Sequence, residues 1–230
     1  MRKYIIFNFN VLIISSLFLL FSCKKDTLEN TSNDDKLFFP SNIGHYVIYD
    51  VDSSYIFQGK SVKTHFQVKE LIESNFLDNS NRNTQRIERY IRLSDTANWV
   101  LSRVWYSNLT ASSAERIEEN MRYVKLIFPI SQWKQWNKNV YVDTVSEIKS
   151  QYTSVFTSYN VNGINFPNTV TVSLENDSSI IHKNYNIEVY AKNVGMIYRQ
   201  MIYLRKKIDD SGNFIFDSDN ECTYKIINYN

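Results

Sequence analysis

Apolar and polar side chains alternate along most of this chain, which is the pattern of β-strands with one buried and one solvated face. In residues 61–69, Val62, Phe66 and Val68 alternate with lysines, a histidine and a glutamine. Similar segments recur at short intervals without helices between them. They predict strands at residues 45–51, 54–58, 61–69, 86–93, 99–106, 121–128, 140–146, 151–158, 166–174, 180–190, 195–206, 213–217 and 222–228.

Only one segment favours helix. Residues 111–119 contain helix formers and serine capping candidates, so they predict either a short helix or a loop that enters the next strand. Residues 133–139 are expected to be an irregular polar and aromatic segment. The pattern therefore predicts a mainly β single domain with little helix. Its antiparallel sheet is either a curved half-barrel or a sandwich.

The first residues have a different character. Arg2 and Lys3 precede an apolar run over residues 11–21, and Ser22 and Cys23 close it. This run has the length of a signal-peptide core and is shorter than the roughly 20 residues that span a bilayer. Residues 20–23, Leu-Phe-Ser-Cys, resemble the lipobox of bacterial lipoproteins. The resemblance implies cleavage before Cys23 and lipidation of its thiol.

A transmembrane anchor that begins near Tyr4 is the alternative, and Asn8 and Asn10 within that extension argue against it. We therefore expect a signal peptide at residues 1–22 and a flexible polar tether at 23–36, because the tether lacks an apolar period. The β-rich domain is expected at 37–230. The lipid on Cys23 would attach this domain to a membrane, which we expect to be the outer membrane, facing either the periplasm or the cell surface.

Composition narrows the possible partners. The chain has 26 basic and 24 acidic residues, and removing Arg2 and Lys3 with the leader leaves 24 of each. A near-neutral chain without a basic cluster is a poor candidate for binding nucleic acid. The sequence has two cysteines, so lipidation of Cys23 would leave Cys222 without a partner for an intramolecular disulfide. We expect Cys222 to be a small buried residue.

Three phrases together resemble a family of uncharacterised Bacteroidetes-type lipoproteins. They are Phe-Phe-Pro-Ser-Asn-Ile-Gly-His-Tyr at 38–46, Tyr-Val-Lys-Leu-Ile-Phe-Pro at 123–129 followed by Trp-Asn at 136–137, and Tyr-Ala-Lys-Asn-Val-Gly-Met-Ile-Tyr at 190–198. Tyr46 stands where that family often has tryptophan. The resemblance implies a β domain behind a lipobox, and it implies no activity.

Three short motifs resemble the O-glycosylation sites of secreted Bacteroidetes proteins, in which Asp and then Ser or Thr precede an apolar residue. The candidate acceptors are Thr27, Thr96 and Thr144.

Candidate catalytic and metal-binding residues are sparse. His45, His65 and His182 match no metal-ligand spacing, so we expect them at solvent-facing strand positions. The chain has no Gly-x-Ser-x-Gly nucleophile motif. Asp217, Asp219 and Glu221 alternate as oxygen ligands could, and a charged hairpin end explains them equally well. No metal, no cofactor and no enzymatic activity are therefore expected.

Trp133 and Trp136 lie beside Asn137 and Asn139 and could form a platform on which a sugar ring stacks. Such tryptophans more often close the end of a β core. The leading hypothesis for function is a non-catalytic, lipid-anchored binding or assembly module with a protein partner in the cell envelope. The alternatives are a carrier of lipid or another apolar ligand in the concave face of a half-barrel, and a glycan-binding surface lipoprotein.

Overall fold

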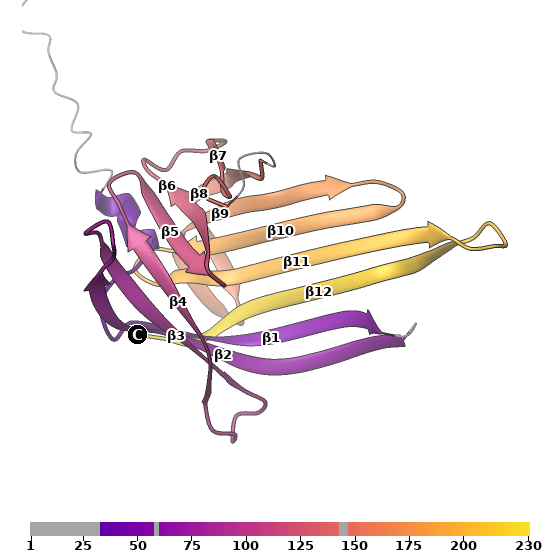
Figure 1. Cartoon of the computed structure of the whole chain (residues 1–230), viewed down its shortest axis with the longest axis horizontal. Helices are drawn as coiled ribbons and strands as arrows, with labels where there is room; N and C mark the ends of the chain where they lie inside the picture. Colours follow the sequence, from indigo (N-terminus) through magenta and orange to yellow (C-terminus); the bar gives the residue numbers. More distant parts are fainter. Residues whose placement is uncertain (1–32, 58–59, 143–146) are drawn as a thin grey trace, which may run out of the picture. The chain divides into compact units, whose positions relative to one another are not determined.

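The computed structural model describes residues 33–57, 60–142 and 147–230. They form one antiparallel sheet of twelve strands with a short 3-10 helix in front of it (Figure 1). The elements are η2 (Lys36–Phe38), β1 (Tyr46–Phe57), β2 (Lys60–Leu77), β3 (Asn83–Arg92), β4 (Val100–Leu109), β5 (Ser113–Glu118), β6 (Met121–Ile127), β7 (Gln135–Asn137), β8 (Lys149–Val161), β9 (Ile164–Ser178), β10 (His182–Ala191), β11 (Gly195–Ile208) and β12 (Phe214–Tyr229). The predicted mainly β fold with an antiparallel curved sheet is confirmed.

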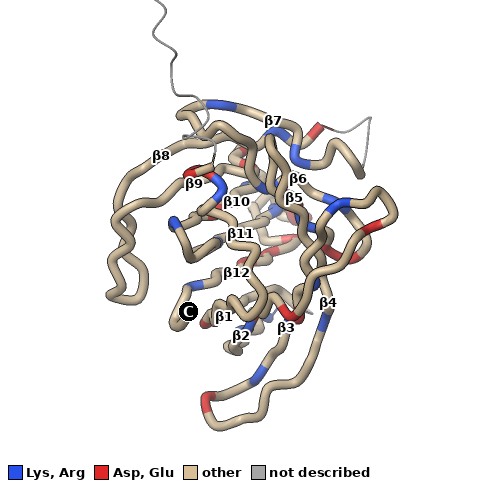
Figure 2. Tube along the Cα trace, turned by 90° about the vertical axis from the view of Figure 1, so that its left-hand side faces the viewer, with Lys and Arg blue, Asp and Glu red and all other residues tan. Residues whose placement is uncertain are grey.

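The sheet runs in the order β6-β5-β4-β3-β2-β1-β12-β11-β10-β9-β8-β7, so almost every strand pairs with its neighbour in sequence. The exception is β12, which pairs with β1 and joins the two halves of the chain. Seen along the strands, the sheet curls until its two outermost strands lie near one another (Figure 2). The curl brings side chains from opposite ends of the sheet order into one core.

Hydrogen bonds outside the regular ladder bring the two ends of the sheet together. The amide of Val124 on β6 donates to the carbonyl of Lys138 just after β7 (2.8 Å), and the indole of Trp136 donates to the carbonyl of Val124 (3.0 Å). The Tyr152 hydroxyl of β8 accepts from the Ile127 amide (3.0 Å) and donates to the Ile127 carbonyl (2.8 Å). These contacts satisfy backbone groups that an open sheet edge would leave exposed.

The end of the β8–β9 hairpin folds over the neighbouring strands. Asn162 has φ 52° and Gly163 has φ 77°, so this two-residue turn has the left-handed geometry of a tight hairpin. The Asn162 side chain donates to the carbonyl of Ile226 on β12 (3.1 Å). The rings of Tyr159 and Tyr198 lie 5.7 Å apart between their centroids. This part of the sheet is therefore covered by a second layer of the same sheet.

One main hydrophobic cluster draws on both halves of the sheet and on the segment before β1. Its largest fully buried members are Phe38, Tyr49, Leu126, Tyr152, Leu174, Tyr190, Ile197 and Ile226. A smaller cluster consists of Ile72, Ile87 and Trp105. The free Cys222 packs at the margin of the main cluster, half-buried, where burial raises the pKa of its thiol.

The prediction of a helix or loop over residues 111–119 is wrong. Residues 113–118 form β5, which pairs with β4 and β6 on its two sides, and Ala114 is fully buried. Helix propensity is a weak preference, and strand pairing on both sides overrides it here. Glu119 and Asn120 both have positive φ, so a two-residue left-handed turn ends the strand.

Other boundaries also differ from the sequence predictions. The predicted strands 45–51 and 54–58 are one strand, β1, because its serines pair in register with β2 and β12. Residues 213–217 and 222–228 likewise join into β12. The irregular segment 133–139 contains the short strand β7. Of the predicted strand 140–146, residues 140–142 form a turn and 143–146 lie outside the described residues.

Among the described residues, no helix has the length and apolarity needed to cross a membrane. The predicted leader and most of the tether, with Cys23 and Thr27, lie outside those residues, as does Thr144.

Candidate functional site

The segment just before β1 covers one end of the curled sheet, and we call residues 35–45 the plug segment. Phe38 and Phe39 are buried in the main cluster. The carboxylate of Asp35 accepts from the backbone N–H of Ile130 (2.8 Å), and the backbone N–H of Asn193 donates to the Leu37 carbonyl (2.7 Å). Asp35, which the sequence assigns to the tether, thus contacts the β domain.

The end of the plug segment is fixed to the sheet by further hydrogen bonds. The Gly44 amide donates to the Ile72 carbonyl (2.8 Å), and Gly44 has φ +88°, which glycine adopts without strain. The Nε2 atom of His45 lies 3.0 Å from the Val194 carbonyl. The Asn230 side chain donates to the Gly44 carbonyl (3.0 Å) and accepts from the Tyr46 amide (2.8 Å).

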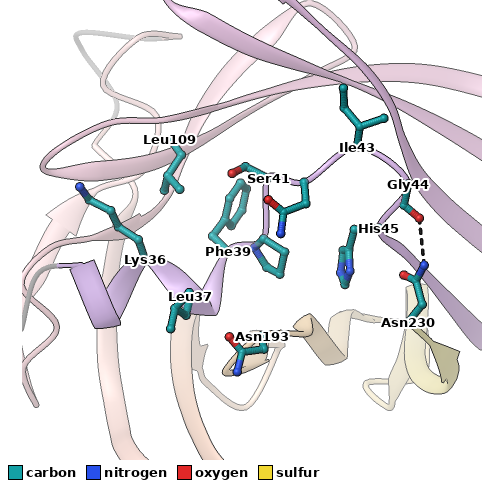
Figure 3. A pocket seen from close by; sticks show the side chains of 12 residues that line it. Lys36, Leu37, Phe39, Ser41, Ile43, Gly44, His45, Leu109, Asn193 and Asn230 are labelled. Atoms are coloured by element: carbon teal, nitrogen blue, oxygen red, sulfur yellow. Dashed lines mark hydrogen bonds between the residues drawn. The ribbon is translucent and has the colours of Figure 1, made fainter.

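A cleft of about 460 Å³ opens over the plug segment (Figure 3). We call it the plug cleft. Its apolar lining consists of Leu37, Phe39, Pro40, Ile43 and Leu109. The polar residues that line it are Lys36, Ser41, Asn42, His45, Asn193 and Asn230. The plug cleft has the size of a small-molecule site and a mixed polar and apolar lining.

Three polar side chains in the plug cleft are free to bind a ligand. The Ser41 hydroxyl and the side-chain amides of Asn42 and Asn193 make no hydrogen bond within the described part of the chain. Lys36 contributes the only permanent positive charge of the described lining, and no side chain there carries a carboxylate. The plug cleft is therefore suited to a ligand that exchanges hydrogen bonds and carries no positive charge.

Beneath the plug segment lies a smaller cavity of about 40 Å³, for which Phe39, Pro40 and His45 also provide lining. Glu70 and Arg116 line its other side, so its walls are partly charged. Its volume is enough for a water molecule, and its lining offers polar partners to one.

Around this cavity a first group of buried charges is paired. The carboxylate of Glu70 accepts from Arg89 (2.9 Å) and from Arg116 (2.9 Å). Burial raises the pKa of Glu70, but the two guanidinium groups outweigh it, and the net pKa lies below the ordinary value. The Arg89 guanidinium also lies over the Trp105 ring, 3.9 Å from its centroid.

A second group surrounds Glu188, which is fully buried. Its carboxylate accepts from Lys125 (2.7 Å) and from the Tyr190 hydroxyl (2.6 Å), and Arg199 lies 3.4 Å away. Burial alone would raise the pKa of Glu188, but Lys125 and Arg199 lower it to about 2. Burial and the charge of Lys125 lower the pKa of Lys138. These groups neutralise one another and lie away from the plug cleft lining.

Few residues of the plug cleft and of the two charged groups were candidates in the sequence analysis. Of the three histidines, His45 lines the plug cleft and is half-buried, which differs from the solvent-facing strand position expected for it. His65 contacts Asp52 (2.9 Å) and His182 contacts Asp177 (2.8 Å), both near the surface. Among the described residues, no group of three or more potential ligands is arranged to hold a metal ion.

The two candidate tryptophans have different surroundings. Trp133 is 60% exposed, with φ 66°. Trp136 packs on Tyr152, with 4.8 Å between ring centroids, and its indole N–H is occupied by the Val124 carbonyl. Thr96, the one candidate acceptor threonine among the described residues, is exposed in the turn after β3.

The buried charges were missed because polar residues were assumed to face solvent. Glu70 follows Val62, Thr64, Phe66 and Val68 on the same face of β2, and Ile72 comes next. A carboxylate between two apolar residues of a buried face is the one signal in the sequence that could have revealed this group.

Comparison with known proteins adds little to this picture. No family model matches the chain, and no curated protein does. One similar solved structure is a candidate exported protein with a YmcC-like fold from Bacteroides fragilis, at 9% identity and a TM-score of 0.47, covering 84% of this chain and 98% of that one. Another is a candidate lipoprotein from Parabacteroides distasonis, at 8% identity and a TM-score of 0.40, with the same two coverages. Both likenesses are too distant to support a conclusion about this chain.

Proposed function

We propose that this chain is a lipid-anchored protein of the cell envelope whose folded domain is a non-catalytic binding module, with the plug cleft as its binding site. The plug cleft carries the proposal, because it combines a ligand-sized volume with polar side chains that have no partner within the described residues. The anchor rests on the signal-peptide pattern and on Cys23. The membrane is the direct partner, an envelope protein is a further one, and nucleic acid is not a partner.

The non-catalytic part of the proposal has its own support. A general acid or base works best with a pKa near the working pH, and it needs access to a substrate. The pKa of Glu188 is lowered to about 2, and its carboxylate is fully buried and held by Lys125, Tyr190 and Arg199. Its chemistry is therefore that of a structural ion pair.

A carrier of apolar ligands is the second candidate. Several apolar side chains are exposed near the ends of the long hairpins, among them Phe57, Phe214 and Phe216 at 52–59% exposure. They could contact an acyl chain along the projecting strands. The cavity beneath the plug segment does not favour this reading, because it is small and partly charged. Glycan binding at the exposed ring of Trp133 is a third candidate.

The anchor is tested by replacing Cys23 with serine in the native host. We expect the unaltered chain to incorporate labelled fatty acid and the Cys23→Ser protein to incorporate none, because the variant has no thiol for diacylglycerol. Cys222→Ser is the matched control and should incorporate the label. An unaltered chain that takes up no labelled fatty acid and keeps its leader would contradict lipidation and favour the transmembrane alternative.

The binding site is tested by native mass spectrometry of the full chain purified from its own envelope. We expect the unaltered chain to retain a small molecule. The Asn42→Trp variant should lose it, because the new ring fills the plug cleft from an exposed position. Asn220→Trp places the same ring on an exposed part of β12 and should retain it. Equal retention in both variants would contradict the assignment of the site.

A further inference from the structure

The plug cleft also indicates what kind of ligand it binds, provided that it is the binding site proposed above. We propose that it takes an anionic saccharide, a sugar unit that carries a carboxylate. Lys36, Asn193 and the Ser41 side chain lie around the plug cleft and give it a positive charge and free hydrogen-bonding groups (Figure 3).

Charge is the first step. Lys36 is half-buried at the margin of the plug cleft, and its ammonium has only a long contact with Asn33 (3.4 Å). No described side chain in the lining carries a carboxylate to neutralise it. An anionic ligand therefore gains an ion pair with Lys36 at this position, whereas a cationic ligand is repelled by Lys36.

The free side chains are the second step. Each amide of Asn42 and Asn193 offers donors and an acceptor, and the Ser41 hydroxyl can act as either. A ligand with several hydroxyl groups matches such a set, because each hydroxyl both donates and accepts. Leu109 and Ile43 supply apolar surface for the C–H face of a ring.

The backbone offers little to the main competing class, an acidic peptide. One common way for an extended peptide to bind is to pair with free backbone groups of the protein. Several of these groups in the plug cleft are already paired: Asn193 with Leu37, His45 with Asn42, and Gly44 with Ile72 and Asn230. The free side chains are therefore the main binding groups, which favours a hydroxyl-rich ligand over a peptide.

The test measures binding of three probes to the full lipidated chain in detergent, by saturation-transfer NMR and calorimetry. The probes are glucuronate, glucose and glucosamine, which share a pyranose ring and differ in charge. We expect glucuronate to bind about three- to tenfold more tightly than glucose, as a partly exposed ion pair allows, and glucosamine to bind most weakly. Lys36→Met should remove the difference between glucuronate and glucose.

A second variant tests the amide. Asn193 has φ 66°, so Asn193→Gly removes the side chain without straining the backbone. We expect it to weaken glucuronate binding about tenfold, the effect of losing a hydrogen bond to a bound ligand. Asn81→Gly is the matched control, since Asn81 has φ 56° and is exposed elsewhere, and it should bind as the unaltered chain does.

The proposal is overturned if glucosamine binds as well as glucuronate, if Asn193→Gly behaves like Asn81→Gly, or if none of the three sugars binds. Retention of a small molecule that Asn42→Trp abolishes, without binding of any sugar, refutes the saccharide and leaves the binding module in place. If no sugar binds and no small molecule is retained, both the saccharide and the assignment of the plug cleft as a binding site are refuted.

Discussion

Glu188 is the residue on which the charged interior depends. It has no exposed surface, and its carboxylate is held by an ammonium, a guanidinium and a phenol. Removing one member of a buried ion pair lowers the free energy of unfolding more than replacing the whole pair by apolar residues does. The reason is that the remaining partner is left as a buried, uncompensated charge. Lys125 would be left in this situation, since Glu118 lies farther from it, at 3.4 Å.

We predict that Glu188→Gln lowers the free energy of unfolding by about 3 kcal/mol at pH 7. The pKa of Glu188 falls from an ordinary 4.5 to about 2 in the folded state. The stabilisation by its charge is therefore complete above pH 4.5 and is lost as the pH falls towards 2. Urea unfolding of both proteins across this range should show their difference shrinking to near zero.

Glu221→Gln is the control for this experiment, because Glu221 is exposed and no ion pair is seen for it among the described residues. Its free energy of unfolding should stay within about 0.5 kcal/mol of the unaltered protein at every pH. A difference for Glu188→Gln that is independent of pH between 4.5 and 2 would show that packing, rather than charge, is responsible.

The strands show what the sequence can predict at the level of elements. Alternation identified most of them because a strand with one buried face has a strict two-residue period. It failed at β5, where Ala, Ser and Glu favour helix in isolation while pairing with β4 and β6 decides the outcome. Alternation also fixes which residues share a face, and it places Glu70 on the apolar face of β2, but it does not show which cations lie opposite Glu70 in the folded chain.

The plug cleft was beyond prediction for a related reason. Its residues come from the plug segment, the end of β4, the turn before β11 and the last residue of the sequence, which are brought together only by the curl of the sheet. Asn42 and Asn193 read as ordinary turn residues in the sequence. Nothing in their spacing indicates that they line the same cleft.

The contact between the plug segment and the sheet depends on Gly195 at the start of β11. Gly195 has φ +88°, and a Cβ added there would lie 3.3 Å from Cδ of Pro40. Gly212 has a similar φ of +83° and no atom within 4 Å of such a Cβ. The two glycines thus share the backbone cost of substitution by alanine, and only Gly195 adds a steric cost from the plug segment.

We predict that Gly212→Ala lowers the free energy of unfolding by about 1 kcal/mol, the cost of a left-handed alanine. Gly195→Ala should cost about 1 kcal/mol more, because Pro40 must move. A double-mutant cycle with Pro40→Ala, followed by urea unfolding, isolates this contact. If both glycine variants lower the free energy of unfolding equally, Pro40 moves away from the new Cβ without a measurable loss of stability.

At the scale of the whole described sheet, the strands differ along their own length. At one end, the curled sheet closes around the core and the plug segment. At the other, the hairpins β1–β2, β9–β10 and β11–β12 project beyond it (Figure 1, right). Within β11 the first three residues are buried, whereas residues 205–208 are exposed. Cooperative stability comes from buried contacts, so each long strand should combine a stable half with a weak one.

We therefore predict a steep gradient of amide hydrogen exchange along single strands. Amides of β11 near Ile197 and of β10 near Val189 should exchange only through global unfolding, because both residues are fully buried. Amides at 205–208 and in the facing part of β12 should exchange through local opening, at rates that rise little when mild denaturant is added. Exchange measured by mass spectrometry on overlapping peptides of the full chain separates the two halves. Uniform protection along β11 would mean that the projecting hairpins are covered in solution, and a surface over Phe214 and Phe216 would then have to be buried against another molecule.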